Sequence, residues 1–187
     1  MKRYFFFLFI AGILFGCDSD TVSITDQGVA DPFMPGNYWI YSRADTLDTL
    51  TVSSHGNAIM DEDRTLYSID KVGFWDDCYL VISFNPQAGD TLGKSGHLSL
   101  KVGSKVAPGK LLSIVGALHI PVTVPGGTFI TNRFHWRGVT EDGTIAFDII
   151  TYFNSSIGII KQETWIADDS GVLQLTSTRE LLRYKIR

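Results

Sequence analysis

The side chains in this sequence that could bind a metal ion or carry out acid–base chemistry are widely spaced. Its four histidines are His55, His97, His119 and His135. None has a second histidine or an acidic residue at the spacing that a zinc site requires, and the sequence has no HExxH pattern. We therefore predict that each histidine is a surface residue of a strand or loop, and we expect no metal site.

Acidic residues cluster in two places, at 61–63 and at 76–77. Neither cluster has the spacing of an EF-hand, so we interpret both as solvated loops, with a weak calcium site as the alternative. No G-x-S-x-G motif marks a nucleophilic serine. A pair of carboxylates for sugar hydrolysis would come from distant strands, and local sequence does not reveal such a pair. We predict no catalytic residue.

One segment matches a relaxed nucleotide-binding pattern. Residues 88–95 read AGDTLGKS, with alanine in place of the first glycine. A phosphate-binding loop joins a strand to a helix, because the amides at the helix N-terminus hold the phosphate. Here the segment leads into His97–Val102, which alternates like a strand. We interpret residues 88–95 as a turn between strands, and we expect no nucleotide and no other cofactor.

The most specific chemistry in the sequence belongs to a thiol near its N-terminus. Lys2 and Arg3 precede an apolar run from Tyr4 to Phe15. A run of about 7–15 residues is typical of a signal peptide, whereas a membrane-spanning helix needs about 20. Gly16 and Cys17 follow, and the sequence then turns polar. This pattern predicts a signal peptide over residues 1–16.

Leu14-Phe15-Gly16-Cys17 resembles the lipobox of bacterial lipoproteins. The resemblance implies that the Cys17 thiol receives a diacylglyceryl group, that the chain is cleaved after Gly16, and that the new N-terminus is acylated with a fatty acid such as palmitate. Two or more acyl chains on Cys17 would hold the protein on a membrane. An ordinary cleaved signal peptide and an uncleaved anchor are the alternatives.

The residue after Cys17 bears on the membrane to which the protein is sorted. Asp18 signals inner-membrane retention under the enteric sorting rule, whereas other diderm bacteria use acidic residues here for export. We expect a lipid-anchored protein of the cell envelope, on the outer rather than the inner membrane. The sequence does not distinguish the periplasmic face of that membrane from its outer surface. If Cys17 is acylated, Cys78 is a lone thiol, and we expect it to be buried and inert.

Composition limits the remaining possibilities. Removal of residues 1–16 leaves 171 residues with a net charge of −6, spread along the chain. Such a chain fits one domain, and the lack of a basic stripe argues against a nucleic-acid partner. Residues 17–35 are polar and contain two prolines, so we predict a lipidated cysteine and flexible tether there, followed by a single domain over residues 36–187.

The domain has the pattern of an all-β protein. Aromatic and β-branched runs recur between clusters of Gly, Pro, Asn and Asp. The last third predicts four strands, at 128–137, 144–153, 157–166 and 172–186, joined by short links that include Asp142-Gly143. Short links force antiparallel neighbours. We predict a four-stranded C-terminal meander in an antiparallel sheet curled into a barrel-like or sandwich domain. A short helix over residues 179–184 is an alternative.

Alternation within the strand at 128–137 predicts which of its sides is buried. One side carries Ile130, Phe134 and Trp136. The opposite side carries Arg133, His135 and Arg137 together with Phe129. We expect the first side to face the core. We also expect the four tryptophans to be core residues rather than the lining of a sugar- or lipid-binding groove: Trp39, Trp75, Trp136 and Trp165.

Three local patterns, in this order, resemble those of a loose group of uncharacterised bacterial lipoproteins and secreted proteins. They are GNYWIY at 36–41, VTVPGGTF at 122–129 and IGIIK at 157–161, which match G-x-x-W-x-Y, V-P-x-G-T-F and G-x-G-L-V-K. The third departs from the pattern at Ser156 and at the two isoleucines. The resemblance implies an antiparallel β-rich domain without an established enzyme activity.

These observations favour a non-catalytic envelope lipoprotein whose β domain binds a ligand or partner. Its expected partners are the membrane, through Cys17, and either an apolar ligand held in a cavity of the curled sheet or another envelope protein. An envelope hydrolase acting on sugars is the first alternative, and a structural or assembly subunit is the second. No residue of a binding site can be named from the sequence alone.

Overall fold

The computed structural model describes residues 33–52, 57–60, 66–69, 72–76 and 79–186. Several predicted features therefore lie outside the described residues: Cys17, His55, residues 61–63, Asp77 and Cys78. The same holds for the side chains of Trp75 and Asp76. No helix in the described part of the chain is long and apolar enough to cross a membrane.

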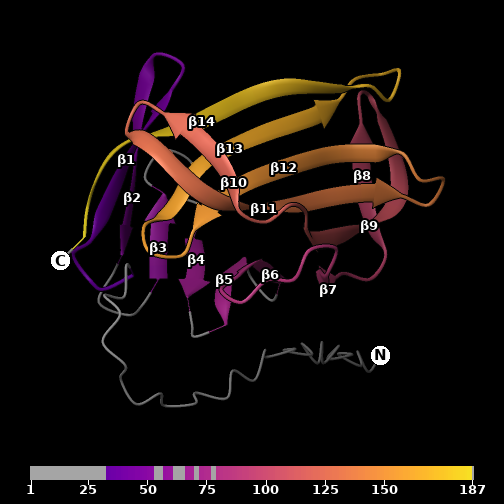
Figure 1. The fold of residues 1–187 in the computed structure, drawn as a ribbon. Helices are drawn as coiled ribbons and strands as arrows, with labels where there is room; N and C mark the ends of the chain where they lie inside the picture. Colours follow the sequence, from indigo (N-terminus) through magenta and orange to yellow (C-terminus); the bar gives the residue numbers. More distant parts are fainter. Residues whose placement is uncertain (1–32, 53–56, 61–65, 70–71, 77–78, 187) are drawn as a thin grey trace, which may run out of the picture.

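The described ranges form an all-β fold of fourteen strands (Figure 1). They are β1 (Tyr38–Arg43), β2 (Thr46–Val52), β3 (Asn57–Met60), β4 (Leu66–Ile69), β5 (Gly73–Asp76), β6 (Tyr79–Ser83), β7 (Thr91–Lys94), β8 (Leu98–Val102), β9 (Lys105–Val115), β10 (Ile120–Val124), β11 (Gly127–Thr140), β12 (Ile145–Asn154), β13 (Gly158–Ala167) and β14 (Leu173–Lys185).

All fourteen strands belong to one antiparallel sheet. Its order is β6-β5-β4-β3-β2-β1-β14-β13-β12-β11-β9-β7, while β10 pairs with β11 and β8 pairs with β9. The sheet curls until its outer strands meet: β6 lies against β7 and β9, and the Ser113 hydroxyl donates to the Val81 carbonyl over 3.4 Å. No strand pairing joins β6 to β7 in the described part, so the curl stays open. The predicted barrel-like all-β domain and its C-terminal meander are confirmed.

Short turns fix the meander as the sequence predicts. Gly143 adopts φ 89°, a left-handed conformation that favours glycine, and the Thr144 amide donates to Asp142 Oδ1 over 3.1 Å. At the next turn the Ser156 amide donates to Asn154 Oδ1 over 2.9 Å. Side chains that bond their own backbone in this way stabilise turns. They place β11, β12 and β13 in consecutive antiparallel register.

Two local expectations are wrong. Residues 91–94 form β7, which pairs irregularly with β9, rather than part of a turn. Its sequence, TLGK, is too short to show alternation. The alternative of a helix over residues 179–184 is excluded, because these residues lie in β14 between β1 and β13. Pairing with β13 up to Glu180 and with β1 from Glu180 onward satisfies that backbone, and this outweighs local helix propensity.

The hairpin formed by β8 and β9 packs across one end of the meander (Figure 1). The tip of the β8–β9 hairpin meets the β13–β14 turn, where the Gly103 amide donates to the Ala167 carbonyl over 3.1 Å. Asp169 Oδ1 accepts from the Ser104 amide over 2.6 Å and from its hydroxyl over 2.7 Å. In the same turn Asp168 Oδ1 accepts from the Ser170 hydroxyl over 2.6 Å. Ionised aspartates therefore hold this junction together.

Acid should loosen this junction. Hydrogen bonds from Ser170, Val172 and Gln174 lower the pKa of Asp168 from 3.8 to about 2. A lowered pKa in the folded state means that its stabilisation is complete above about pH 4 and is lost as pH falls through about 2. We expect the urea midpoint to fall over this range, and to fall less in Asp168→Asn, which keeps the acceptor but does not titrate. An equal decline in both proteins would contradict this assignment.

The core lies inside the curl of the sheet. Its fully buried side chains include Trp39, Tyr41, Phe134 and Phe153. The Trp39 indole donates to the Ile157 carbonyl, and the Tyr41 hydroxyl donates to the Ile159 carbonyl over 3.0 Å. The prediction that Trp39 is a core residue is confirmed, and Trp136 packs against the core. Interior aromatic rings thus fasten β1 to β13.

Gly158 lies against the Trp39 ring in a left-handed conformation that favours glycine. A Cβ atom there would lie 3.4 Å from the Trp39 ring, and the residue has φ 112°. The register between β12 and β13 shifts next to it, between Tyr152 and Phe153. A bulge of this kind bends the sheet and increases its twist.

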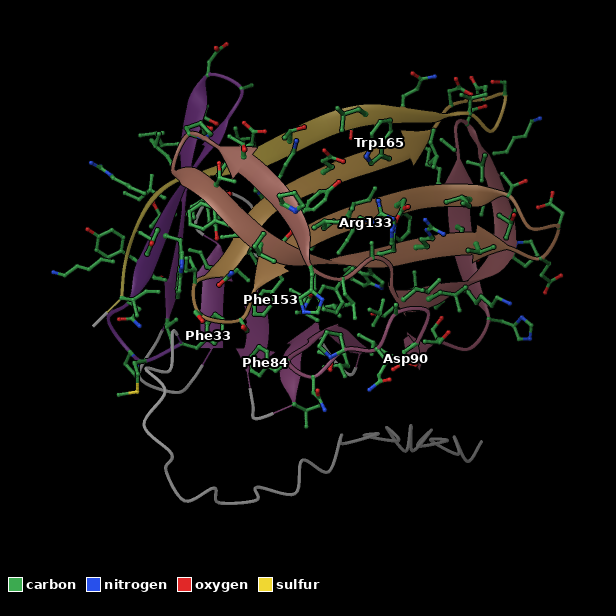
Figure 2. The ribbon with its side chains drawn as sticks, viewed as in Figure 1. Phe33, Phe84, Asp90, Arg133, Phe153 and Trp165 are labelled. Carbon is green, nitrogen blue, oxygen red and sulfur yellow. The ribbon has the colours of Figure 1, made fainter. Side chains whose placement is uncertain are left out.

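Phe33 belongs to the core although the sequence predicts a tether there. Its ring stacks on Phe84 at 5.6 Å and on Phe153 at 6.1 Å, and it lies 5.7 Å from Trp39. Figure 2 shows Phe33, Phe84 and Phe153 grouped in the lower part of the molecule. A lone aromatic residue beside prolines gives no strand signal, so the pattern of the sequence does not reveal this packing.

Truncation of Phe33 should destabilise the domain. Removing a buried aromatic ring leaves a cavity, and Phe→Ala changes in cores cost about 3–5 kcal/mol. We expect Phe33→Ala to lower the free energy of unfolding by this amount in urea denaturation. Met34→Ala is the matched control, because the Met34 side chain is exposed. Equal stability of the two variants would show that Phe33 is not part of the core.

Candidate functional site

One side of the meander carries a dense set of charged side chains, which we call the polar face. Alternation puts it opposite the buried Phe134, on the side of β11 that holds Arg133, His135 and Arg137. Strand register extends it in three rows: Arg133–Tyr152–Lys161–Glu180, His135–Ile150–Glu163–Thr178 and Arg137–Asp148–Trp165–Leu175. Four adjacent strands therefore position the set on a rigid sheet.

His135 is the most buried of the basic residues on the polar face. Its side chain is 10% exposed, and Nδ1 lies 3.0 Å from Asp148 Oδ2. Arg137 Nε donates to the same oxygen over 2.8 Å. Arg137 Nη2 also lies 3.0 Å from His135 Nδ1, so the three side chains form one compact cluster. The prediction of a surface histidine is wrong at this position.

The reason for the burial of His135 lies in the chain segment beside it. Between β9 and β10, residues 116–119 run along β11 without forming a strand, and the Gly116 amide donates to the Arg133 carbonyl over 2.8 Å. A Cβ atom at Gly116 would lie 3.0 Å from the His135 imidazole and 3.1 Å from Arg133 Nε. The missing side chain lets this segment cover both residues.

Lys161 is shared between two acids. Its Nζ lies 3.0 Å from Glu163 Oε1 and 3.2 Å from Glu180 Oε1. Partial burial acts to lower the pKa of the Lys161 ammonium, but the hydrogen bonds to Glu163 and Glu180 outweigh it and raise the pKa above its usual range. The Trp165 indole donates to Glu163 Oε2 over 3.4 Å. This group of charges is therefore internally balanced and fixed in place.

Arg133 differs from the other cations of the polar face. Its Nε is buried and has no hydrogen-bond partner among the described residues. The guanidinium lies beside the Tyr152 hydroxyl and acts to lower the pKa of that hydroxyl. Partial burial raises the pKa of that hydroxyl, with Glu163 adding to the rise and Arg133 opposing it. Tyr152 is therefore protonated near neutral pH, and its own O–H can serve as a donor.

A hairpin borders the polar face at the end where Arg133 lies. In Figure 1, β10 and the first part of β11 cross in front of β13 and β14, and both of these strands contact β10. The Gly126 amide in the hairpin turn donates to the Leu181 carbonyl over 2.8 Å. The Phe129 ring meets the Tyr184 ring edge-on at 6.3 Å. The hairpin is thus fixed to the sheet.

The remaining residues that the sequence singles out are two histidines, which lie outside the polar face, and Trp165, which lies in its third row. His97 is exposed and lies 3.3 Å from Glu141, and His119 is exposed with φ 56°. Both are surface residues, as predicted. The prediction of a core residue is wrong at Trp165, which is half-buried on the polar face, and Figure 2 shows it with Arg133 among β11 to β14. Within the described ranges, no three His, Cys, Asp or Glu side chains converge as metal ligands would.

Comparison of the chain with protein-family models, with curated proteins and with solved structures finds no match.

Proposed function

We propose that this protein is a lipid-anchored envelope protein whose β domain binds a polar ligand without changing it chemically. Acylated Cys17 would hold the domain on the membrane, and the polar face would contact the ligand. The observation that carries the proposal is the unpartnered Arg133 Nε within a face where the other charged groups are already paired. Nε itself is enclosed, but the Arg133 side chain is partly exposed, so an anionic ligand would supply the charge partner that the described residues do not.

The pairing on the polar face favours binding over catalysis. A general acid or base must be free to exchange its proton with the substrate. His135 Nδ1 lies 3.0 Å from Asp148, Arg137 also holds Asp148, and Lys161 is held by two carboxylates. Groups that are fixed in this way can orient a ligand, whereas proton transfer would break the pairs. The interior of the curl supports an apolar cavity less well, because the stacked rings of Phe33, Phe84 and Phe153 lie there.

Thermal denaturation tests this proposal. Full-length protein in detergent would be mixed with the dialysable polar fraction of the bacterial envelope. At a hundredfold excess over Kd, a ligand adds about 2.7 kcal/mol, and each kcal/mol shifts Tm by about 2–4 °C in a domain of this size. We expect Tm to rise by several degrees in wild type and to stay constant in Arg133→Gln. An equal rise in both proteins, or no rise in either, would contradict binding at Arg133.

A sugar hydrolase is the second candidate, because Glu163 and Glu180 both lie within hydrogen-bonding distance of Lys161 Nζ. Glycosidases use two carboxyl groups roughly 5–10 Å apart, one of which is protonated. The shared ammonium favours ionisation of both acids here, which leaves no general acid in this pair. Release of reducing ends from envelope glycans by wild type, abolished in Glu163→Gln and in Glu180→Gln, would establish the hydrolase instead.

A further inference from the structure

The charges around Arg133 define what kind of ligand fits. Arg137 is paired with Asp148, and Lys161 is shared by Glu163 and Glu180. On the described polar face, Arg133 is thus the cation that no carboxylate holds. The acids close to it, above all Glu163 beside Tyr152, would repel a dianion. A ligand with a single negative charge fits this balance best.

The donors at this place suit a carboxylate. A guanidinium presents parallel N–H groups that match the two oxygens of a carboxylate. The Tyr152 hydroxyl lies on the neighbouring strand, directly opposite Arg133, and adds a third donor. A carboxylate that accepted from the partly exposed Arg133 guanidinium and from Tyr152 would give this cation the acid partner that the described residues do not supply.

The rest of the row suits hydroxyl groups. From Tyr152 the row continues to Lys161 and Glu180 on the next two strands, with Glu163 in the adjacent row. Ammonium donors and carboxylate acceptors therefore alternate beside the cation. A sugar hydroxyl both donates and accepts, so it can bond to either kind of group. A simple fatty acid would displace the water around these groups and offer no hydrogen bond in exchange, which is costly.

We propose that the polar face binds a sugar acid, with its carboxylate on Arg133 and Tyr152 and its hydroxyls on Lys161, Glu163 and Glu180. This inference rests on the proposed binding function and names its ligand class. The sheet holds the contacting groups in fixed register, so the ligand would meet a preformed site.

Isothermal titration of full-length protein in detergent tests the ligand class with D-glucuronate, D-glucose and inorganic phosphate as probes. We expect D-glucuronate to bind at least about tenfold more tightly than either other probe. Arg133→Gln should weaken D-glucuronate binding at least about tenfold, because it removes the charge and the paired donors. Arg133→Lys should not restore it, since an ammonium lacks the planar fork.

Two controls keep the test decisive. Lys101→Gln removes the same charge from an exposed position on β8 and should bind D-glucuronate like wild type. Tyr152→Phe keeps the ring and should weaken binding by about threefold to tenfold through loss of one hydrogen bond. Unliganded melting curves would verify that each variant is folded.

Three results would overturn the sugar-acid assignment: phosphate binding tighter than D-glucuronate, equal binding of D-glucuronate and D-glucose, or no binding of any probe. If the envelope fraction still raises Tm in an Arg133-dependent manner, the binding function stands and only the ligand class is wrong. If that rise is also absent, both proposals fail.

Discussion

Replacing Asp48 with alanine is expected to lower the free energy of unfolding by about 3–5 kcal/mol, because it leaves an uncompensated charge in the core. The Asp48 carboxylate is fully buried, and its Oδ2 lies 2.9 Å from Arg179 Nε. Arg179 Nη1 also donates to Gln162 Oε1 over 3.0 Å, and Gln162 Nε2 donates to Thr151 Oγ1 over 3.3 Å. A chain of polar groups therefore spans β2, β14, β13 and β12.

The matched control removes both charges. Asp48→Leu combined with Arg179→Met replaces the buried pair by apolar side chains, and such replacements are often neutral or stabilising. We expect the double variant to recover most of the loss caused by Asp48→Ala, measured from urea unfolding curves. If Asp48→Ala costs less than about 1 kcal/mol, or if the double variant is no better, the pair is not the buried link described above.

Replacing Cys17 with serine is expected to move the protein from the membrane fraction to the soluble fraction, or to leave it unprocessed. The thiol is the atom that the lipobox pattern implies for acylation, and serine offers no thiol. Each buried methylene contributes about 0.8 kcal/mol, so loss of two or three acyl chains removes nearly all of the membrane affinity. Fractionation followed by mass spectrometry of the N-terminal peptide measures both processing and lipid.

The second cysteine provides the control for this experiment. Cys78→Ser removes a thiol that has no predicted role in anchoring, so this variant should stay in the membrane fraction and carry the lipid. A Cys17→Ser protein that is processed and sedimented like wild type would show that the anchor assignment is wrong.

The meander could be predicted because its strands are long and its turns are explicit. β11 to β14 alternate over ten or more residues, and Asp-Gly and Asn-Ser links mark two of the turns. β3 and β5 are four residues each, NAIM and GFWD, too short for a period of two to be recognised. The core packing of Phe33 cannot be recognised in the sequence for a related reason, because this residue packs through its ring alone and extends no strand.

The polar face could be predicted only in part. Alternation on β11 groups Arg133, His135 and Arg137 on one side, as expected from the sequence. The burial of His135 on that side could not be predicted, because alternation along one strand does not show that residues 116–119 cover it. Asp148 lies opposite Arg137 because the register between β11 and β12 shifts at Gly138, whereas a hairpin counted from Asp142-Gly143 without that bulge would place Phe147 there. The pairing of Lys161 with Glu180 needs the β13–β14 register, which contains a bulge.

The most direct test of binding through Arg133 is the proton–nitrogen NMR signal of its Nε–H group. This donor is buried and lacks a partner in the described structure, whereas Arg137 Nε donates to Asp148. On addition of D-glucuronate to the full-length protein in detergent, we predict that the Arg133 Nε–H signal shifts while the Arg137 and Arg179 signals stay in place. An unmoved Arg133 signal, with both D-glucuronate and the polar envelope fraction, would contradict the account.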